Sequence, residues 1–303
     1  MIVVTGEALI DLVPEGGLLR PSPGGSPYNV AVGLARLGRR VGYLGPLSDD
    51  GFGRLLARGL TEEGADTILA TPTRAPTTLA VVHLDAEGRA GYRFYLEGTS
   101  AVGVRPEDLP ALPHGAALHL SLGAVGLRTV PAGETYRTLL DRERGRRFVS
   151  LDPNVRAEAV TDHATYRTLL EEAVACCDLV KVSDEDLAAL YPDRDPIEVA
   201  RRWRDLGPAL VVVTRGASGV WAGAPVGEVE VSAIEVEVVD TVGAGDAFTS
   251  ALLATLAVDH RLTRGSLDHL DTGQLTGALT YAAGAAALAC TRRGADPPRT
   301  GDW

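Results

Sequence analysis

The sequence has few of the residues that mark secreted, metal-binding or nucleic-acid-binding proteins. Its three cysteines are the adjacent Cys176 and Cys177 and the isolated Cys290, which give neither a disulfide framework nor the spacing of a metal site. Of the 29 lysine and arginine residues, one is a lysine, Lys181. The formal net charge of −11 disfavours a nucleic-acid partner and an anionic membrane surface.

A long hydrophobic run is also missing. The longest uncharged stretch, from Thr272 to Thr291, approaches the length of a bilayer span. Glycines and Gln274 interrupt it and most of it is alanine, so we expect a buried helix. No signal peptide is expected, because Met1 leads directly into the apolar residues 2–5 and the acidic Glu7 follows. We therefore expect a cytoplasmic protein.

Short apolar runs alternate with amphipathic stretches along most of the chain. Runs typical of strands occupy residues 2–5, 41–44, 117–120, 147–151, 179–182 and 210–213. Helical patterns occupy residues 30–37, 52–60, 165–174 and 196–206. This alternation predicts a three-layer α/β/α fold with a mostly parallel central sheet and ligands at the carboxyl ends of its strands. The length allows one large domain or two smaller ones, and we expect a single domain over residues 1–303.

Two regions break this alternation. Residues 9–21 predict a hairpin around Glu15-Gly16-Gly17, and residues 77–84 and 91–96 predict another, joined through residues 85–88. Four short strands without helices do not fit into a doubly wound sheet. We therefore expect a small second β-sheet, formed by residues 9–22 and 77–98.

The segment from Asp240 to Phe248, Asp-Thr-Val-Gly-Ala-Gly-Asp-Ala-Phe, contains a candidate anion-binding turn. It follows a pattern typical of a half-exposed strand at residues 234–239 and precedes an apolar helix predicted at residues 247–257. Its small residues therefore lie at a helix N-terminus, where backbone amides and the helix dipole favour phosphate. These residues are Gly243, Ala244 and Gly245.

Asp246 is unusual beside an anion-binding turn. Its carboxylate would repel the ligand unless it takes a proton from a hydroxyl that attacks the phosphorus. The alternative is an aspartate that caps the helix. The sequence does not contain the motifs of two other classes of nucleotide-dependent enzyme. No predicted strand is followed by the Gly-x-Gly-x-x-Gly motif of dinucleotide dehydrogenases, and Lys181 is not in the Gly-Lys-Ser/Thr context of P-loop kinases.

The segment 240–248 resembles the C-terminal signature of the ribokinase-like (PfkB) family of carbohydrate kinases, and Gly24-Gly25-Ser26-Pro27-Tyr28-Asn29 resembles its N-terminal signature. Further matches extend from Glu7 to Gly294, and the fructokinases are the nearest group. The resemblance implies transfer of the γ-phosphoryl group of ATP to a primary hydroxyl of a small sugar, with Asp246 as base. It also implies Mg2+ on the phosphates and a lid over the sugar, formed by the predicted small sheet.

The resemblance places the sugar against the N-terminal half. It implies that Asp11 accepts hydrogen bonds from sugar hydroxyls and that Asn29 contacts the sugar, while Gly24 and Gly25 allow close approach of the backbone. From the residues alone, Asp11 could simply start a hairpin and Asn29 could be a local capping amide. Ser26 is predicted to be the N-cap of the following helix.

The resemblance places ATP against the C-terminal half. Asp152-Pro-Asn-Val-Arg156 resembles a motif whose arginine lies near the transferred phosphate, and Ser183 and Asp186 stand where the family has an asparagine and a glutamate that organise Mg2+. Asp186 is one methylene shorter, so we expect it to act on Mg2+ through water. Ala283 takes the place of a residue near the adenine. The nucleotide contacts expected are Lys181, Ser183, Thr214, Gly216, Gly219, Gly243, Gly245 and Ala283.

A monovalent cation lies behind the anion site in this family. The resemblance implies that K+ would be bound through the backbone carbonyls of Asp240, Val242, Ala289 and Gly294.

Residues 91–101 resemble the lid strand of fructokinases, which predicts D-fructose, phosphorylated at its 6-hydroxyl, as the substrate. Arg93 and Tyr95 share one face of a strand. If Tyr95 covers the sugar, Arg93 could bind a carboxylate there, so 2-keto-3-deoxygluconate stays open, as does ribose. Alternatively, Arg93 faces solvent and pairs with Glu97. A non-catalytic sugar-binding protein is the alternative from another class, although the presence of Asp246 disfavours it.

The predicted lid carries more apolar surface than one sugar can cover, and such edges usually need a partner. Lid-to-lid dimers are implied by the resemblance, so we expect a homodimer through the lid. The apolar residues concerned are Leu12, Val13, Leu18, Leu19, Val81, Val82, Phe94 and Leu96.

Overall fold

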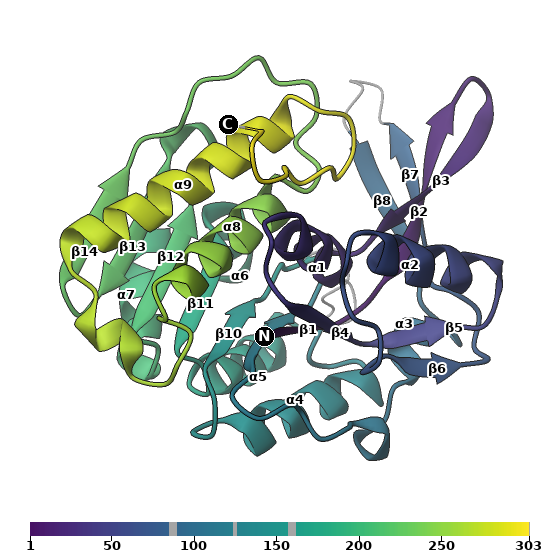
Figure 1. Ribbon diagram of the computed structural model, residues 1–303, viewed down its shortest axis with the longest axis horizontal. Coiled ribbons are helices and arrows are strands. Elements are labelled where there is room, and N and C mark those ends of the chain that lie inside the picture. Colours follow the sequence, from purple (N-terminus) through teal and green to yellow (C-terminus); the bar gives the residue numbers. More distant parts are fainter. Residues whose placement is uncertain (85–89, 124–125, 157–161, 303) are drawn as a thin grey trace.

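The computed structural model describes residues 1–84, 90–123, 126–156 and 162–302, and a large twisted sheet forms its centre (Figure 1). Neighbouring strands are parallel except where β13 and β14 join at one edge. The strand order is β14 (Gly227–Val231), β13 (Val220–Ala224), β12 (Leu210–Thr214), β11 (Leu179–Ser183), β10 (Val149–Asp152), β9 (Ala117–Ser121), β1 (Ile2–Thr5) and β4 (Val41–Leu44).

All six predicted strands of the central sheet are confirmed, within two residues at their ends. They form because their runs of valine, leucine and isoleucine can be buried on both faces of a parallel sheet. In β11, Leu179 packs into the core on one face and Val180 into the core on the other.

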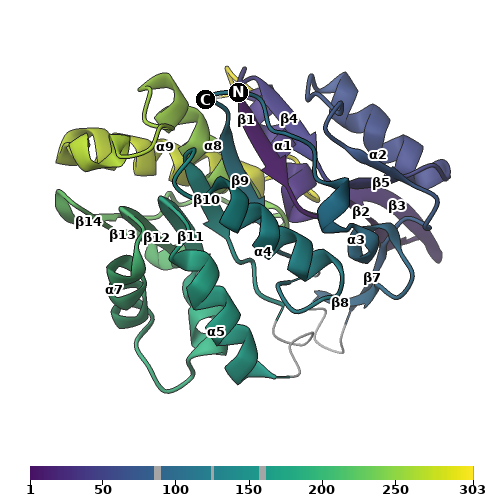
Figure 2. The same ribbon diagram turned by 90° about the horizontal axis from the view of Figure 1, so that it is seen from below.

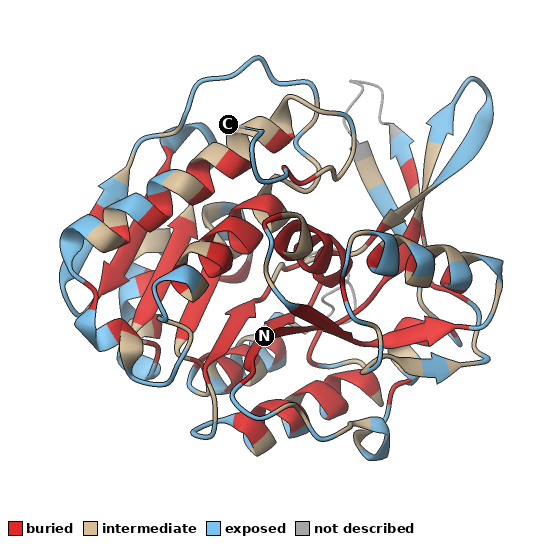
Figure 3. Ribbon diagram, viewed as in Figure 1, coloured by how far each residue is buried: buried red, intermediate tan, exposed pale blue. Residues whose placement is uncertain are grey.

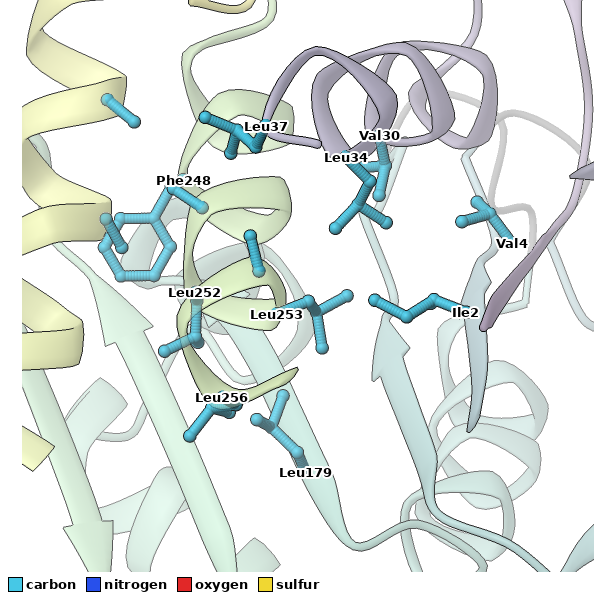
Figure 4. Close-up of a cluster of buried hydrophobic side chains, with 14 of the residues drawn as sticks. Ile2, Val4, Val30, Leu34, Leu37, Leu179, Phe248, Leu252, Leu253 and Leu256 are labelled. Atoms are coloured by element: carbon cyan, nitrogen blue, oxygen red, sulfur yellow. The ribbon is translucent and has the colours of Figure 1, made fainter. Parts of the chain in front are cut away.

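Helices cover both faces of the sheet, as the two views show (Figures 1 and 2). One face is covered by α1 (Ser26–Arg36), α2 (Gly51–Glu62), α8 (Ala244–Val258) and α9 (Thr272–Cys290), and the other by α4 (Ala132–Glu143), α5 (His163–Val174), α6 (Asp184–Leu190) and α7 (Pro196–Leu206). In the core between the sheet and the helices α1, α2, α8 and α9, Leu253 of α8 points toward Ile2 of β1, with Leu34 of α1 nearby (Figure 4). The predicted three-layer α/β/α fold is therefore confirmed.

The uncharged stretch that begins at Thr272 forms α9, the predicted helix. The Asp271 side chain caps it by accepting a hydrogen bond from the Gln274 amide at 2.8 Å. One side of the helix packs against α8 and the core. In the described parts of the chain, no helix has the length and apolar character needed to cross a membrane.

The two predicted hairpins are present and join into one small sheet, which projects from the body of the molecule with an exposed outer end (Figures 1 and 3). Its order is β3 (Leu18–Gly24), β2 (Leu9–Glu15), β7 (Leu79–Leu84) and β8 (Ala90–Tyr95). The parallel pairing of β2 with β7 connects the hairpins. The turn predicted at residues 85–88 lies outside the described residues.

Shorter elements complete the fold. They are β5 (Pro46–Ser48), which pairs with β6 (Thr71–Thr73), the helix α3 (Ser100–Gly103), and single 3-10 turns at Pro106–Asp108, Gly216–Ser218 and Ser266–His269.

The prediction of a strand at residues 234–239 is wrong. This segment has no regular secondary structure, and Ile234, Val236 and Val238 are exposed. Its apolar and glutamate residues alternate as in a strand, but β14 already forms the edge of the sheet and the segment pairs with no strand.

Candidate active site

The N-termini of α1 and α8 converge at Asp246. Gly243 caps α8 in the left-handed conformation (φ 79°), as the predicted turn requires. The Ala244 amide donates to the Thr241 carbonyl at 3.2 Å and so helps to close the turn.

The carboxylate of Asp246 is held by two side chains from the first turn of α1. Ser26 Oγ donates to Oδ1 at 2.6 Å and Asn29 Nδ2 donates to Oδ2 at 2.8 Å. Burial raises the pKa of Asp246, while these two hydrogen bonds act to lower it. Asp246 does not cap α8, since the cap is Gly243.

Ser26 is not the N-cap of α1, contrary to the prediction. The cap is Gly25, with φ 97° and no capping side chain, and the helix begins at Ser26. The positive φ of Gly25 turns the chain one residue earlier than the Ser-Pro pattern indicates. The Ser26 hydroxyl is thereby available to Asp246.

A buried ion pair lies beneath the anion site. Lys181 Nζ donates to Asp152 Oδ2 at 3.0 Å, and a Cβ on Gly245 would lie 3.1 Å from this Nζ. Burial acts to lower the pKa of Lys181, but the charges of Asp152, Asp186 and Asp246 outweigh it and raise the pKa. Lys181 therefore lies directly beneath the turn.

Asp152 was not singled out in the sequence as a site residue. It ends the buried strand β10 and is itself almost completely buried. A charged residue at the carboxyl end of a buried strand is the signal that could have identified it.

Asp11 of β2 lies close enough to Arg156 and Asp246 for their charges to act on it. Burial raises its pKa to about 6, the charge of Arg156 opposes this rise, and the charge of Asp246 adds to it. A Cβ on Gly24 would overlap the Asp11 carboxylate, which explains why glycine occupies that position. The structure thus brings Asp11, Arg156 and Asp246 together.

Strand β8 places Tyr92 and Phe94 on the same face of the small sheet as Asp11. Phe94 pairs with Ala80, and Ala80 with Asp11, so Phe94 and Asp11 share a face of the small sheet. Tyr92 stacks on Phe94 with ring centroids 6.1 Å apart, and its pKa is raised by burial and then by the charge of Asp11.

Arg93 and Tyr95, both predicted as sugar contacts, consequently point to the face of the small sheet opposite Asp11. Strand alternation shows which residues share a face. The pairing with β7 decides which face meets the pocket, and this pairing is not visible in the sequence.

The residues expected near Mg2+ lie at the start of α6. Ser183 Oγ accepts the Asp186 amide at 3.0 Å and caps the helix, so its hydroxyl is engaged. Burial, followed by the charge of Asp152, raises the pKa of Asp186 to about 6, against the opposing charge of Lys181. Arg156 Nη1 donates to Asn154 Oδ1 at 2.8 Å.

The predicted nucleotide turn lies at the end of β12. Thr214 ends the strand, and Gly216 and Gly219 have φ values of 50° and 83°. A Cβ on Gly219 would overlap the Val231 carbonyl, so the turn packs closely on the end of β14. Ala283 of α9 is buried in the core on the α8 side of the sheet.

The loop before α8 and the loop after α9 are joined by one side chain. Asp240 Oδ1 accepts the Val242 amide at 3.0 Å, and Oδ2 accepts the Gly294 amide at 2.8 Å. The Ala289 carbonyl nearby accepts the Arg292 amide at 3.1 Å. Within the described residues, no group of three histidine, cysteine or acidic side chains could hold a metal ion.

Comparison with known proteins agrees with this geometry. The family model of the pfkB family carbohydrate kinases matches residues 1–300. A fructokinase of Rhizobium leguminosarum bv. trifolii is 39% identical over 277 residues, covering 89% of this chain and 84% of that protein. A fructokinase of Klebsiella pneumoniae is 37% identical over 298 residues, covering 97% and 94%.

Solved structures show the same similarity. The fructokinase of Xylella fastidiosa with bound ATP has a TM-score of 0.87 and 30% identity, covering 97% of this chain and 93% of that one. A double mutant of the fructokinase of Vibrio cholerae O395, with fructose, ADP and potassium ion bound, has a TM-score of 0.84 and 30% identity, with the same coverage. The chain therefore belongs to the pfkB family of carbohydrate kinases and is an ATP-dependent sugar kinase.

Proposed function

We propose that this kinase phosphorylates D-fructose at its 6-hydroxyl. The observation that carries the proposal is the Asp246 carboxylate, fixed by Ser26 and Asn29 at the start of α8 in the same pocket as Asp11. The similarity to fructokinases, one of them solved with fructose bound, favours this sugar over ribose.

In the proposed reaction, Asp246 takes the proton of the 6-hydroxyl as its oxygen attacks the γ-phosphorus of ATP. The amides of Gly245 and Asp246 stabilise the charge that develops on the phosphoryl oxygens, and they do so without reorganisation because the helix fixes them. Arg156 supplies a positive charge on the same side. Asp11 accepts hydrogen bonds from the other sugar hydroxyls.

The small sheet would act as the lid of a single kinase domain that spans residues 1–303. The rings of Tyr92 and Phe94 face the pocket and can cover the sugar, excluding water that would otherwise hydrolyse ATP. We place the nucleotide against Thr214, Gly216 and Gly219.

Mg2+ and K+ are proposed cofactors. Because the described residues offer no three-ligand cluster, Mg2+ would be held mainly by phosphate oxygens and waters, as this ion prefers, with Asp186 behind them. The carbonyls around Asp240 and Gly294 suit a monovalent cation, and Asp240 fixes both loops. Bound K+ would add positive charge behind the anion site.

We also propose a homodimer formed through the lid, in the cytoplasm. Leu18, Leu19 and Tyr95 are 76%, 50% and 53% exposed and lie on the two edge strands of the small sheet, where exposed apolar side chains favour a covering partner. Val82, also predicted in this surface, is buried. The three cysteines form no disulfide.

A substrate panel tests the proposed sugar. We expect kcat/KM to be highest for fructose, ahead of ribose and 2-keto-3-deoxygluconate, because no arginine of β8 faces the pocket to bind a sugar acid. Arg93→Ala should leave the fructose value unchanged. A sugar acid preferred more than tenfold, about 1.4 kcal/mol, and lost in Arg93→Ala would overturn the assignment.

A further inference from the structure

A chain of hydroxyl groups leads from the central sheet to the base. Ser121, the last residue of β9, donates from Oγ to Ser26 Oγ at 2.8 Å, and Ser26 donates to Asp246 Oδ1 at 2.6 Å. Both serines are buried, Ser121 completely. The second distance is in the short range typical of a hydroxyl bonded to a charged carboxylate.

The chain has a defined direction. A hydroxyl has one proton to donate, so Ser26 can donate to Asp246 only while it accepts from Ser121. If Oδ1 were protonated, its proton would need Ser26 as acceptor, and the Ser26 proton would have to turn to Ser121 Oγ, which would reverse the chain. Asn29 Nδ2 can only donate to Oδ2. Both contacts therefore favour the ionised carboxylate.

Helix capping does not explain the Ser26 hydroxyl. No side chain caps α1, whose cap residue is Gly25. Other charges also act on Asp246: Asp152 of β10 raises its pKa, Lys181 of β11 lowers it, and Asp11 of β2 faces the same pocket. His119 of β9, whose pKa burial lowers to about 4, is neutral near pH 7.

We propose that Ser26 and Ser121 are positioning residues, which hold the Asp246 carboxylate in the orientation and protonation state that phosphoryl transfer needs. Ser26 acts directly, and Ser121 acts through Ser26. This role rests on the proposed role of Asp246 as base, and it does not depend on which sugar is used.

The test is the pH dependence of kcat in Ser26→Ala and Ser121→Ala, measured with the best sugar of the panel. Loss of the donor should move the acid limb upward by about one pH unit in Ser26→Ala, the size of one hydrogen bond to a charged group, and by less in Ser121→Ala. The KM for ATP should change less than twofold. At pH 9 both variants should approach the wild-type kcat more closely than at pH 6.

Ser150→Ala is the matched control. Ser150 is a buried hydroxyl on the adjacent strand, but its partners are His119 Nδ1 at 2.9 Å and the Leu118 carbonyl. It should lose comparable stability without moving the acid limb. The proposal would be overturned if the acid limb of the kcat profile stayed in place in Ser26→Ala, or if it shifted by the same amount in Ser150→Ala as in Ser121→Ala.

A second readout does not need turnover. In protein with 13C-labelled aspartate, the Asp246 carboxyl signal can be assigned by its absence in Asp246→Asn. Its titration should shift to higher pH in Ser26→Ala and stay in place in Ser150→Ala. If the wild-type protein were inactive with every sugar, the proposed function would be refuted. If the titration of the Asp246 carboxyl did not shift in Ser26→Ala, the role of the two serines would be refuted.

Discussion

At Gly243, the backbone conformation and the surrounding space both exclude a side chain. Its φ of 79° favours glycine, and a Cβ would lie 2.7 Å from Ala295 Cβ. The left-handed conformation alone costs other residues about 1–2 kcal/mol. The overlap with Ala295 would add to this cost and displace the start of α8.

Gly243→Ala should therefore lower both stability and kcat. We expect the free energy of unfolding to fall by about 2–4 kcal/mol and kcat by about 10²-fold, as for a misplaced catalytic group. Gly64→Ala is the control, because Gly64 has φ 86° with open space around it. Equal losses in the two variants, measured by denaturation and turnover, would refute the role of the overlap.

Asp11 should lower the stability of the fold at neutral pH. Its pKa is about 6 in the folded protein and 3.8 in the unfolded chain, so the folded state holds the proton more tightly. The contribution of this group to stability is therefore present below pH 3.8 and is lost as pH rises through about 6.

Asp11→Asn should accordingly melt at a higher temperature than wild type at pH 7, with a smaller difference at pH 4, while its KM for the sugar rises. The exposed Asp193→Asn serves as control, with no such pH dependence expected. A lower melting temperature of Asp11→Asn at pH 7 would contradict the assignment of burial as the main effect on this carboxyl.

Among the elements, the close packing of α1 on α8 brings Ser26 and Asn29 to Asp246. A Cβ on Gly33 of α1 would lie 2.5 Å from Ser250 Oγ of α8 and 3.2 Å from Pro297 Cβ. A larger residue at this position must push the helices apart. Ser26 and Asn29 would then withdraw from Asp246.

Gly33→Ala should lower kcat with little change in the KM for ATP, because the nucleotide turn belongs to other elements. Gly277→Ala is the matched control: it lies within α9 with no atom in the path of a Cβ, so it should gain up to about 1 kcal/mol from helix propensity and keep full activity. Unchanged kcat in Gly33→Ala would show that the helix contact does not position the base.

Many of the helices and strands could be predicted from the sequence, because the periodicity of apolar residues that marks them is a local feature. The anion turn at Gly243 and the helix after it were predicted because glycine and apolar residues mark them. Three features depended on distant partners: the missing neighbour of residues 234–239, the face that β8 turns to the pocket, and the hydrogen bond of Ser26 to Asp246 across 220 residues. No local pattern contains such information.

On the scale of the whole molecule, the edge strand β3 of the small sheet carries the exposed apolar residues Leu18 and Leu19. We expect Leu19→Arg to convert the proposed homodimer into monomers in light scattering at micromolar concentration. Ile68→Arg, which changes an exposed residue outside the small sheet, should leave the dimer intact. A wild-type monomer at the same concentration would contradict assembly through the lid.

The helices α1 and α8 converge at Asp246, the proposed base. The most direct test is the kcat of Asp246→Asn, measured beside its ATP affinity and melting temperature. The amide keeps the shape of the side chain but cannot take the sugar proton, so kcat should fall by about 10²- to 10⁴-fold while ATP binding and the fold persist. Turnover close to wild type in a folded, ATP-binding Asp246→Asn protein would contradict the account.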